Sequence, residues 1–71
     1  MLDNPEASIA TADVLTLLLH NQYALAAGLE ELALWVKANG SNGTYENAIA
    51  VFETLDTNAS AIAAGIMKLR Q

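Results

Sequence analysis

Two rows of apolar residues, each stepping by alternating threes and fours, lie on either side of a short segment rich in turn-forming residues. This spacing keeps one face of a helix toward a partner helix. If the chain folds back at residue 42, positions equally distant from that point pair along both rows. The sequence therefore predicts an all-α fold, an antiparallel two-helix hairpin. The first ladder is Leu15, Leu18, Gln22, Leu25, Leu29, Leu32 and Val36, and the second is Ala48, Phe52, Leu55, Ala59, Ile62, Ile66 and Leu69.

Capping residues set the expected ends of the two helices. Gly40 suits the end of the first helix, because glycine readily adopts the left-handed backbone conformation that closes a helix. Thr44 is a favourable N-cap for the second. We expect an N-terminal arm at residues 1–10 and a hairpin at 11–71, with helices at about 11–38 and 45–70. The alternative is an earlier start, with Asn4 as the cap and Pro5 at the first helical position.

The hairpin alone leaves much apolar surface for so short a chain. Of the 71 residues, 54% are apolar and 15% are charged, and there is no cysteine to form a disulfide. A chain of this length buries only about 60% of its unfolded surface. We therefore expect a homodimer in which two hairpins form a four-helix bundle. The flank that is apolar on both helices is the expected dimer interface: Leu19, Ala26, Ala33, Ile49, Ala63 and Met67.

The opposite flank of the first helix carries Trp35 and is expected to face another protein. Tryptophan is enriched among the residues that dominate binding energy, and small residues let a partner helix approach closely. The alternative is that Trp35 packs against Leu2 and Ile9 of the arm, or against the dimer mate. The expected partner-binding residues are Val14, Leu17, Ala24, Gly28 and Trp35.

The charge of the chain excludes several classes of partner. The net charge is −5, and only Lys37, Lys68 and Arg70 are positive. Nucleic acids and anionic membrane surfaces require clustered cations, so we expect neither as a partner. No apolar run is long enough for a transmembrane helix, and no basic segment marks a signal peptide. These features, with the absence of cysteine, favour the cytoplasm.

Catalytic and metal-binding patterns are weak. His20 is the only histidine and has no glutamate one turn away, as carboxylate metal bundles require. Glu30 and Glu31 point about 100° apart on a helix and cannot act at one centre. We expect no catalytic residue, no metal and no cofactor, and therefore no enzyme. An enzyme with a site shared across the dimer is the least favoured alternative.

Gln22 is the one polar rung of the first ladder, opposite Ile62. A polar rung costs stability but disfavours wrong registers and wrong oligomers. The sequence thus favours a small homodimeric interaction or regulatory module, of inhibitor or adaptor type. The alternative is a helical bundle that binds a small apolar ligand near Gln22 and Asn21.

The stretch from Leu18 to Leu69 has His-Asn-Gln before a leucine-rich helix and Glu-Glu-Leu-Ala-Leu-Trp-Val near the end of that helix. With these features it resembles short bacterial helical-hairpin proteins. The resemblance implies the same hairpin fold and implies no activity.

Overall fold

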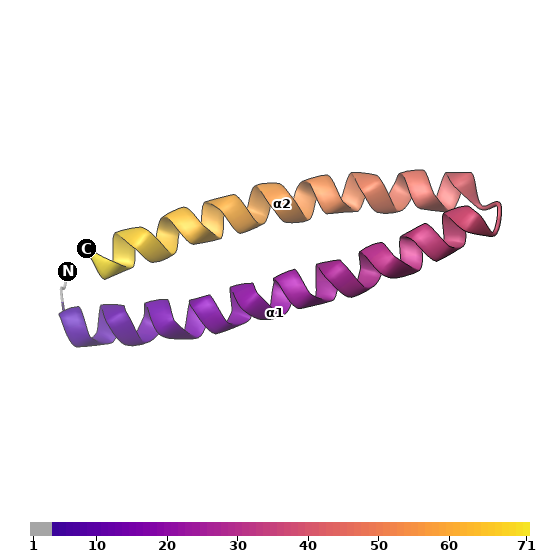
Figure 1. Ribbon diagram of the computed structural model, residues 1–71. Helices are drawn as coiled ribbons and strands as arrows, with labels where there is room; N and C mark the ends of the chain where they lie inside the picture. Colours follow the sequence, from indigo (N-terminus) through magenta and orange to yellow (C-terminus); the bar gives the residue numbers. More distant parts are fainter. Residues whose placement is uncertain (1–3) are drawn as a thin grey trace.

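Two long helices joined by a short turn make up residues 4–71, the part of the chain that the structure describes. In the computed structural model, α1 spans Pro5–Ala38 and α2 spans Asn42–Arg70. The helices run antiparallel and lie side by side (Figure 1), and no strand occurs in residues 4–71. The predicted all-α hairpin is confirmed.

The start of α1 is fixed by a side-chain cap. Asn4 Oδ1 accepts hydrogen bonds from the backbone N–H groups of Glu6 at 3.0 Å and Ala7 at 3.2 Å. Pro5 occupies the first helical position, where its missing N–H costs nothing. The helix therefore starts at Pro5 rather than at Thr11, and the expected arm is helical from Pro5 onward. Residues 1–3 of that arm lie outside the described residues.

The end of α1 follows the prediction made from Gly40. This glycine has a φ of 88°, in the left-handed region. The N–H of Ser41 donates to the Val36 carbonyl at 3.2 Å, and the N–H of Gly40 donates to the Lys37 carbonyl at 3.0 Å. This pair of bonds is the Schellman motif, which satisfies carbonyls that the helix end leaves free.

The second helix begins three residues earlier than the sequence suggested, at Asn42 instead of Tyr45. Ser41 takes the N-cap position, and its hydroxyl donates to Thr44 Oγ1 at 2.9 Å. Thr44, the predicted cap, therefore lies in the first turn of α2. The connection between the helices is correspondingly short, which holds their adjoining ends together.

The core is a thin seam between the helices. Its fully enclosed part is near the chain ends, where half-buried apolar side chains pack around a small buried cluster; Ala33 is buried nearer the turn. The buried cluster is Ala12, Leu19, Ala59 and Ile66, and the residues around it are Leu15, Ile62, Ala63 and Leu69.

The second predicted ladder faces this seam along its whole length, and each of its seven residues is buried or half-buried. In the first ladder, four of the five leucines are exposed. Leu29 is 49% exposed, and the predicted inward orientation is wrong for the other three: Leu18 is 58% exposed, Leu25 69% and Leu32 61%. The residues that replace them at the seam each lie one position further along the chain: Leu19, Ala26 and Ala33.

A rotation of α1 explains this difference. The predicted and observed faces are about 50° apart, half the angle between successive residues of a helix. Leu18, Leu25 and Leu32 on one face and Leu19, Ala26 and Ala33 on the other are all apolar, so both rotations bury apolar side chains. The observed rotation places small side chains, Ala26 and Ala33, against α2, and small side chains allow two helices to approach closely.

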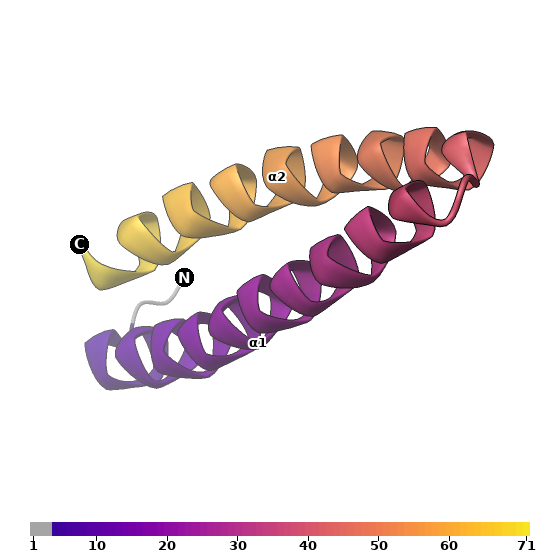
Figure 2. The ribbon, with the colours of Figure 1, turned by 45° about the vertical axis from the view of Figure 1, so that its right-hand side comes forward.

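The hairpin is long and thin, measuring 53 × 16 × 12 Å. Its Cα radius of gyration is 16.4 Å, whereas a compact domain of this length has about 11 Å. In residues 4–71, α1 and α2 lie side by side, and no third layer covers either side of the pair (Figures 1 and 2). Each helix therefore has only one neighbour.

Candidate protein-interaction surface

A row of exposed residues runs along α1 beside the buried seam, with the same alternating spacing of threes and fours. We call it the leucine row. Every position in it is exposed and none is charged. α1 therefore has two faces with helix-packing periodicity, and only one of them is covered by α2. The leucine row consists of Val14, Leu18, Asn21, Leu25, Gly28, Leu32 and Trp35.

An open apolar groove connects the leucine row to α2 near the turn. Its volume is about 290 Å³. Leu32 of the leucine row lines it together with Val51 of α2, which is 55% exposed. Leu32 and Val51 therefore lie on the same side of the hairpin. The groove is lined by Leu29, Leu32, Ala33, Val36, Thr44, Ala48, Val51 and Phe52.

A second row, which includes Val51, runs along α2 on the same side of the hairpin as the leucine row. We call it the α2 row, and it is uncharged like the leucine row. Its positions are exposed except for the half-buried Gly65, and their side chains are small or polar. The two rows together form one uncharged face. The α2 row consists of Asn47, Val51, Thr54, Asn58, Ala61 and Gly65.

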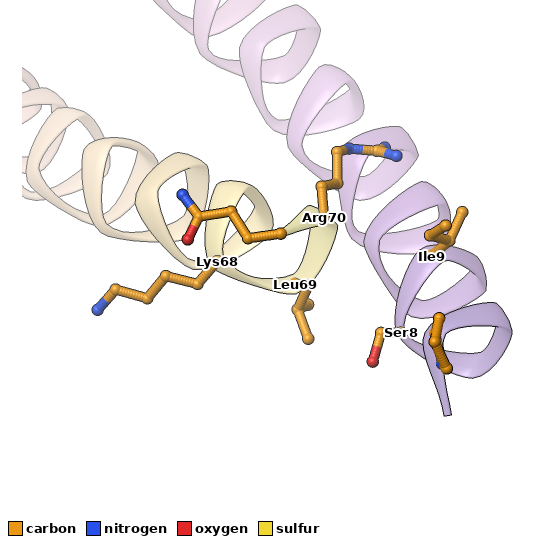
Figure 3. Close-up of a pocket in the computed structure, with 7 residues that line it drawn as sticks. Ser8, Ile9, Lys68, Leu69 and Arg70 are labelled. Atoms are coloured by element: carbon orange, nitrogen blue, oxygen red, sulfur yellow. The ribbon is translucent and has the colours of Figure 1, made fainter. Parts of the chain in front are cut away.

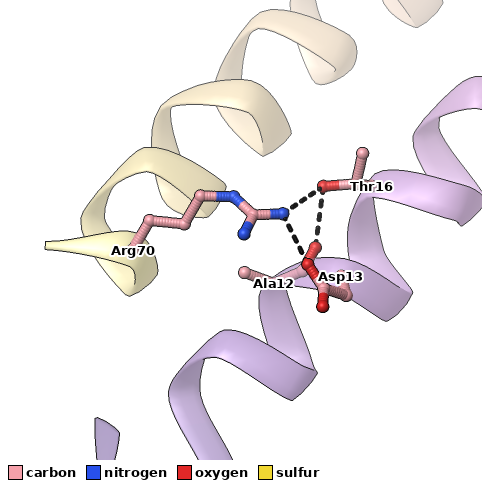
Figure 4. A network of polar contacts seen from close by, with 4 residues as sticks. All are labelled: Ala12, Asp13, Thr16 and Arg70. Carbon is pink, nitrogen blue, oxygen red and sulfur yellow. Dashed lines mark hydrogen bonds and ion pairs between the residues drawn. The ribbon is translucent and has the colours of Figure 1, made fainter. Parts of the chain in front are cut away.

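The other side of the hairpin carries an ion pair and a cation–π contact between the helices. Arg70 donates to Asp13 Oδ1 at 2.9 Å and to Thr16 Oγ1 at 3.3 Å (Figure 4). Lys37 Nζ lies 4.6 Å from the centre of the Tyr45 ring. The Arg70 and Asp13 side chains are 41% and 63% exposed. A pair this exposed stabilises by about 0.2–1 kcal/mol, so it helps to set the register more than it holds the helices together.

All five predicted partner-binding residues are exposed on α1. Val14, Gly28 and Trp35 belong to the leucine row, and Leu17 and Ala24 lie next to it. Trp35 is 64% exposed. Packing of Trp35 on Ile9 does not occur, because both residues lie near opposite ends of the same straight helix (Figure 1). The other arm residue suggested for that contact, Leu2, lies outside the described residues.

The six residues expected at the dimer interface lie mostly at the hairpin's own seam. Leu19 and Ala33 are buried against α2, and Ala26 is half-buried there. In α2, Ile49 and Ala63 are half-buried, and only Met67 is exposed, at 65%. The rotation of α1 turned the expected face inward. The leucine row is exposed, and three of its residues, Leu18, Leu25 and Leu32, are ones that the sequence analysis placed against the second helix.

A pocket of about 400 Å³ lies between the first turns of α1 and the end of α2 (Figure 3). Ser8 and Leu69 line it, while Lys68 points away from α1. None of the described lining residues is a histidine, an aspartate or a glutamate, the side chains that activate a serine nucleophile. The lining residues are Pro5, Ser8, Ile9, Lys68, Leu69, Arg70 and Gln71.

Metal ligands do not gather anywhere in residues 4–71: no three His, Asp or Glu side chains there could hold an ion together. His20 is exposed on α1. Within the same residues, neither helix has an apolar stretch that is long enough to cross a membrane. The uncharged face is therefore the most distinctive surface of the described chain.

Comparisons with protein families, with curated protein sequences and with solved structures find no match. The surface chemistry of the hairpin is accordingly the basis for a functional proposal.

Proposed function

We propose that the protein is a non-enzymatic, homodimeric protein-interaction module, in which the uncharged faces of two hairpins meet to form a four-helix bundle. The leucine row is the observation that supports this most directly. A helix normally buries its apolar faces, and within residues 4–71 α1 has only α2 as a neighbour, which leaves the leucine row uncovered. The row has the spacing that helices use to pack on helices, which makes another helix its best-fitting occupant.

The surface area of the chain supports the same proposal. The hairpin exposes 5251 Å² for a mass of 7.5 kDa. A compact monomer of that mass exposes about 4,200 Å². The excess is about 1,000 Å² per chain, and a standard protein interface buries about 800 Å² per partner. A dimer built on the uncharged face would remove most of this excess.

The charge distribution permits two copies to meet on this side. The chain has a net charge of −5, so two copies repel one another wherever their carboxylates approach. No carboxylate belongs to the leucine row or the α2 row. Beside the leucine row, Leu17 and Ala24 would lie at the edge of such a bundle, where they offer a surface for a further protein of the inhibitor or adaptor type.

The test is the mass of the protein in solution, measured by sedimentation equilibrium at micromolar concentration. We expect twice the chain mass of 7.5 kDa for the natural sequence. Leu25→Glu should give a monomer, because it places a charge in the middle of the leucine row. Leu34→Glu is the matched control: Leu34 is also an exposed leucine of α1, at 47%, but it lies on the opposite side from the row. A monomeric natural protein would contradict the proposal.

A second candidate function is the binding of a small apolar ligand in the groove near the turn. The apolar lining of that groove favours it, but the groove is open and its volume is at the lower end of the range for ligand sites. Gln22, the expected ligand contact, instead donates to the Leu55 carbonyl. Titration with a fluorescent fatty acid tests this function: saturable binding that Val51→Glu abolishes would support it.

A further inference from the structure

We infer that the second copy lies antiparallel to the first, with α1 on α1 and α2 on α2, about a twofold axis perpendicular to the helices. The inference rests on the dimer proposed above and specifies how its two copies are oriented. The supporting observation is that, in both rows of the uncharged face, similar side chains lie at similar distances on either side of a central position.

The leucine row is nearly the same in both directions. Leu25 is at its centre, with Leu18 and Leu32 each seven positions away. In an antiparallel pair about Leu25, Leu18 of one copy meets Leu32 of the other, and each contact occurs twice, as a twofold interface requires. At the ends, the bulky Trp35 faces the smaller Val14.

The polar position of the row also finds a suitable neighbour in this arrangement. Asn21 and Gly28 lie on either side of Leu25. In the antiparallel pair, the Asn21 side chain approaches Gly28 of the second copy. Apart from Gly28's two chain neighbours and the nearby helix backbone, no atom lies within 4 Å of the place where a Cβ of Gly28 would be, so the position is open. The asparagine amide therefore has room, and it faces helix backbone rather than a leucine side chain.

The α2 row is also nearly the same in both directions, about a centre at residue 56. Val51 and Ala61 are five positions from it, and Thr54 and Asn58 are two positions from it. An antiparallel pair of α2 helices would place Thr54 against Asn58, and these two side chains can hydrogen-bond to each other. Small side chains at the other positions allow the two helices to approach closely.

The two centres lie at one level of the hairpin, so a single axis serves both rows. In an antiparallel pair, each step forward on α1 matches a step back on α2. Gln22 Nε2 contacts the Leu55 carbonyl at 3.4 Å. Leu25 is three positions after Gln22, so this contact places it level with residue 52, three positions before Leu55. Arg70 contacts Asp13 at 2.9 Å, which sets Leu25 level with residue 58. The centre of the α2 row lies within this interval.

The other face-to-face twofold arrangement is less favourable. With the axis along the helices, α1 of each copy would lie on α2 of the other. The leucines would then cover the Asn and Thr side chains of the α2 row and remove them from water without a polar partner, which costs free energy. In the arrangement that we infer, leucines pack on leucines, Thr54 meets Asn58, and Asn21 faces the open position at Gly28.

The inference also assigns an occupant to the groove near the turn. Leu32 lines that groove, and Leu32 is the residue that meets Leu18 of the second copy. Two such grooves, one per copy, would each receive a leucine of the other copy. The groove is then part of the dimer packing and not a ligand pocket.

Cysteine cross-linking of the full chain tests the orientation, because the natural sequence has no cysteine. Leu18→Cys, Leu32→Cys and Ala61→Cys proteins are mixed in pairs, treated with a short bis-maleimide and analysed by mass spectrometry. We expect the adduct between the Leu18→Cys and Leu32→Cys proteins to exceed each self-adduct several-fold. Leu25→Cys alone should cross-link to itself, while Leu34→Cys, on the other side of α1, should not.

The outcomes separate this inference from the proposed function. A dominant adduct between the Leu18→Cys and Ala61→Cys proteins would mean that α1 lies on α2, and self-adducts of Leu18→Cys would mean that the α1 helices run parallel. Either result overturns the orientation and leaves the dimer in place. A monomer in sedimentation would overturn the dimer itself.

Discussion

The amide of Gln22 is half-buried between the helices and donates to the Leu55 carbonyl over 3.4 Å. That distance exceeds the usual range for an N–H···O bond. The carbonyl also accepts a bond within α2, as every internal helix carbonyl does. The contact therefore adds little stability. Its physical effect is to penalise registers in which the amide would be buried without an acceptor.

Replacement of this amide by an apolar group should stabilise the hairpin. We predict that Gln22→Leu raises the free energy of unfolding by up to about 1 kcal/mol, because apolar area replaces a weakly bonded amide at the seam. Urea unfolding monitored by circular dichroism measures it. Gln22→Ala is the control and should lower stability, because it removes packing without replacing it. A loss of more than about 1 kcal/mol in Gln22→Leu would show that the amide is strongly bonded.

At the scale of the helices, α2 was predictable from the sequence and the rotation of α1 was not. α2 has one row that is apolar at every position, Ala48 to Leu69, and its other rows contain polar residues, so the face that packs on α1 could be recognised. In α1, the same spacing can be completed in two ways from Leu15, Gln22 and Val36: by Leu18, Leu25 and Leu32, as predicted, or by Leu19, Ala26 and Ala33, as observed. The prediction favoured the row with more leucines, because their larger apolar area favours burial. In the structure, the alanines lie at the seam instead, because small side chains allow the two helices to pack closely.

The turn gives a second prediction, which compares two glycines three positions apart. Gly40→Ala should lower the free energy of unfolding by roughly 1–2 kcal/mol, because its φ of 88° strains any residue with a Cβ. Gly43→Ala should raise it by about 0.5–1 kcal/mol, because Gly43 lies inside α2 and its Cβ position is open. Thermal unfolding of both variants under one condition measures the difference. Equal effects would contradict the left-handed helix end.

The beginning of α1 gives a third prediction. Asn4→Ala should cost about 1 kcal/mol, because it removes an acceptor for two N–H groups at the helix start. Asn4→Ser retains an acceptor and should have nearly the stability of the natural protein. Hydrogen exchange at Glu6 and Ala7 should accelerate in Asn4→Ala alone. Unchanged exchange would mean that α1 does not begin at Pro5.

For the whole molecule, the hairpin buries few of its apolar side chains. Among residues 4–71, five apolar residues are buried, whereas twelve large apolar residues are exposed. Composition alone predicted this excess and hence the need for a partner surface. It could not predict which side chains form that surface, because the rotation of α1 decides whether Leu18 or Leu19 faces α2. The existence of an exposed apolar surface was therefore predictable from the sequence, but the residues that form it were not.

Small-angle X-ray scattering tests the proposed dimer at this scale. Two hairpins stacked face to face, with helix layers 8–10 Å apart, should raise the Cα radius of gyration only from 16.4 Å to about 17 Å. The forward scattering per unit mass should nevertheless double, because the mass doubles while the length does not change. Copies joined head to tail would instead give a radius of about 31 Å, since their centres would lie a full hairpin length of 53 Å apart. Leu25→Glu should halve the forward scattering and Leu34→Glu should leave it unchanged. A doubled mass with a radius near the larger value would show that the chains associate through their ends rather than through the uncharged face.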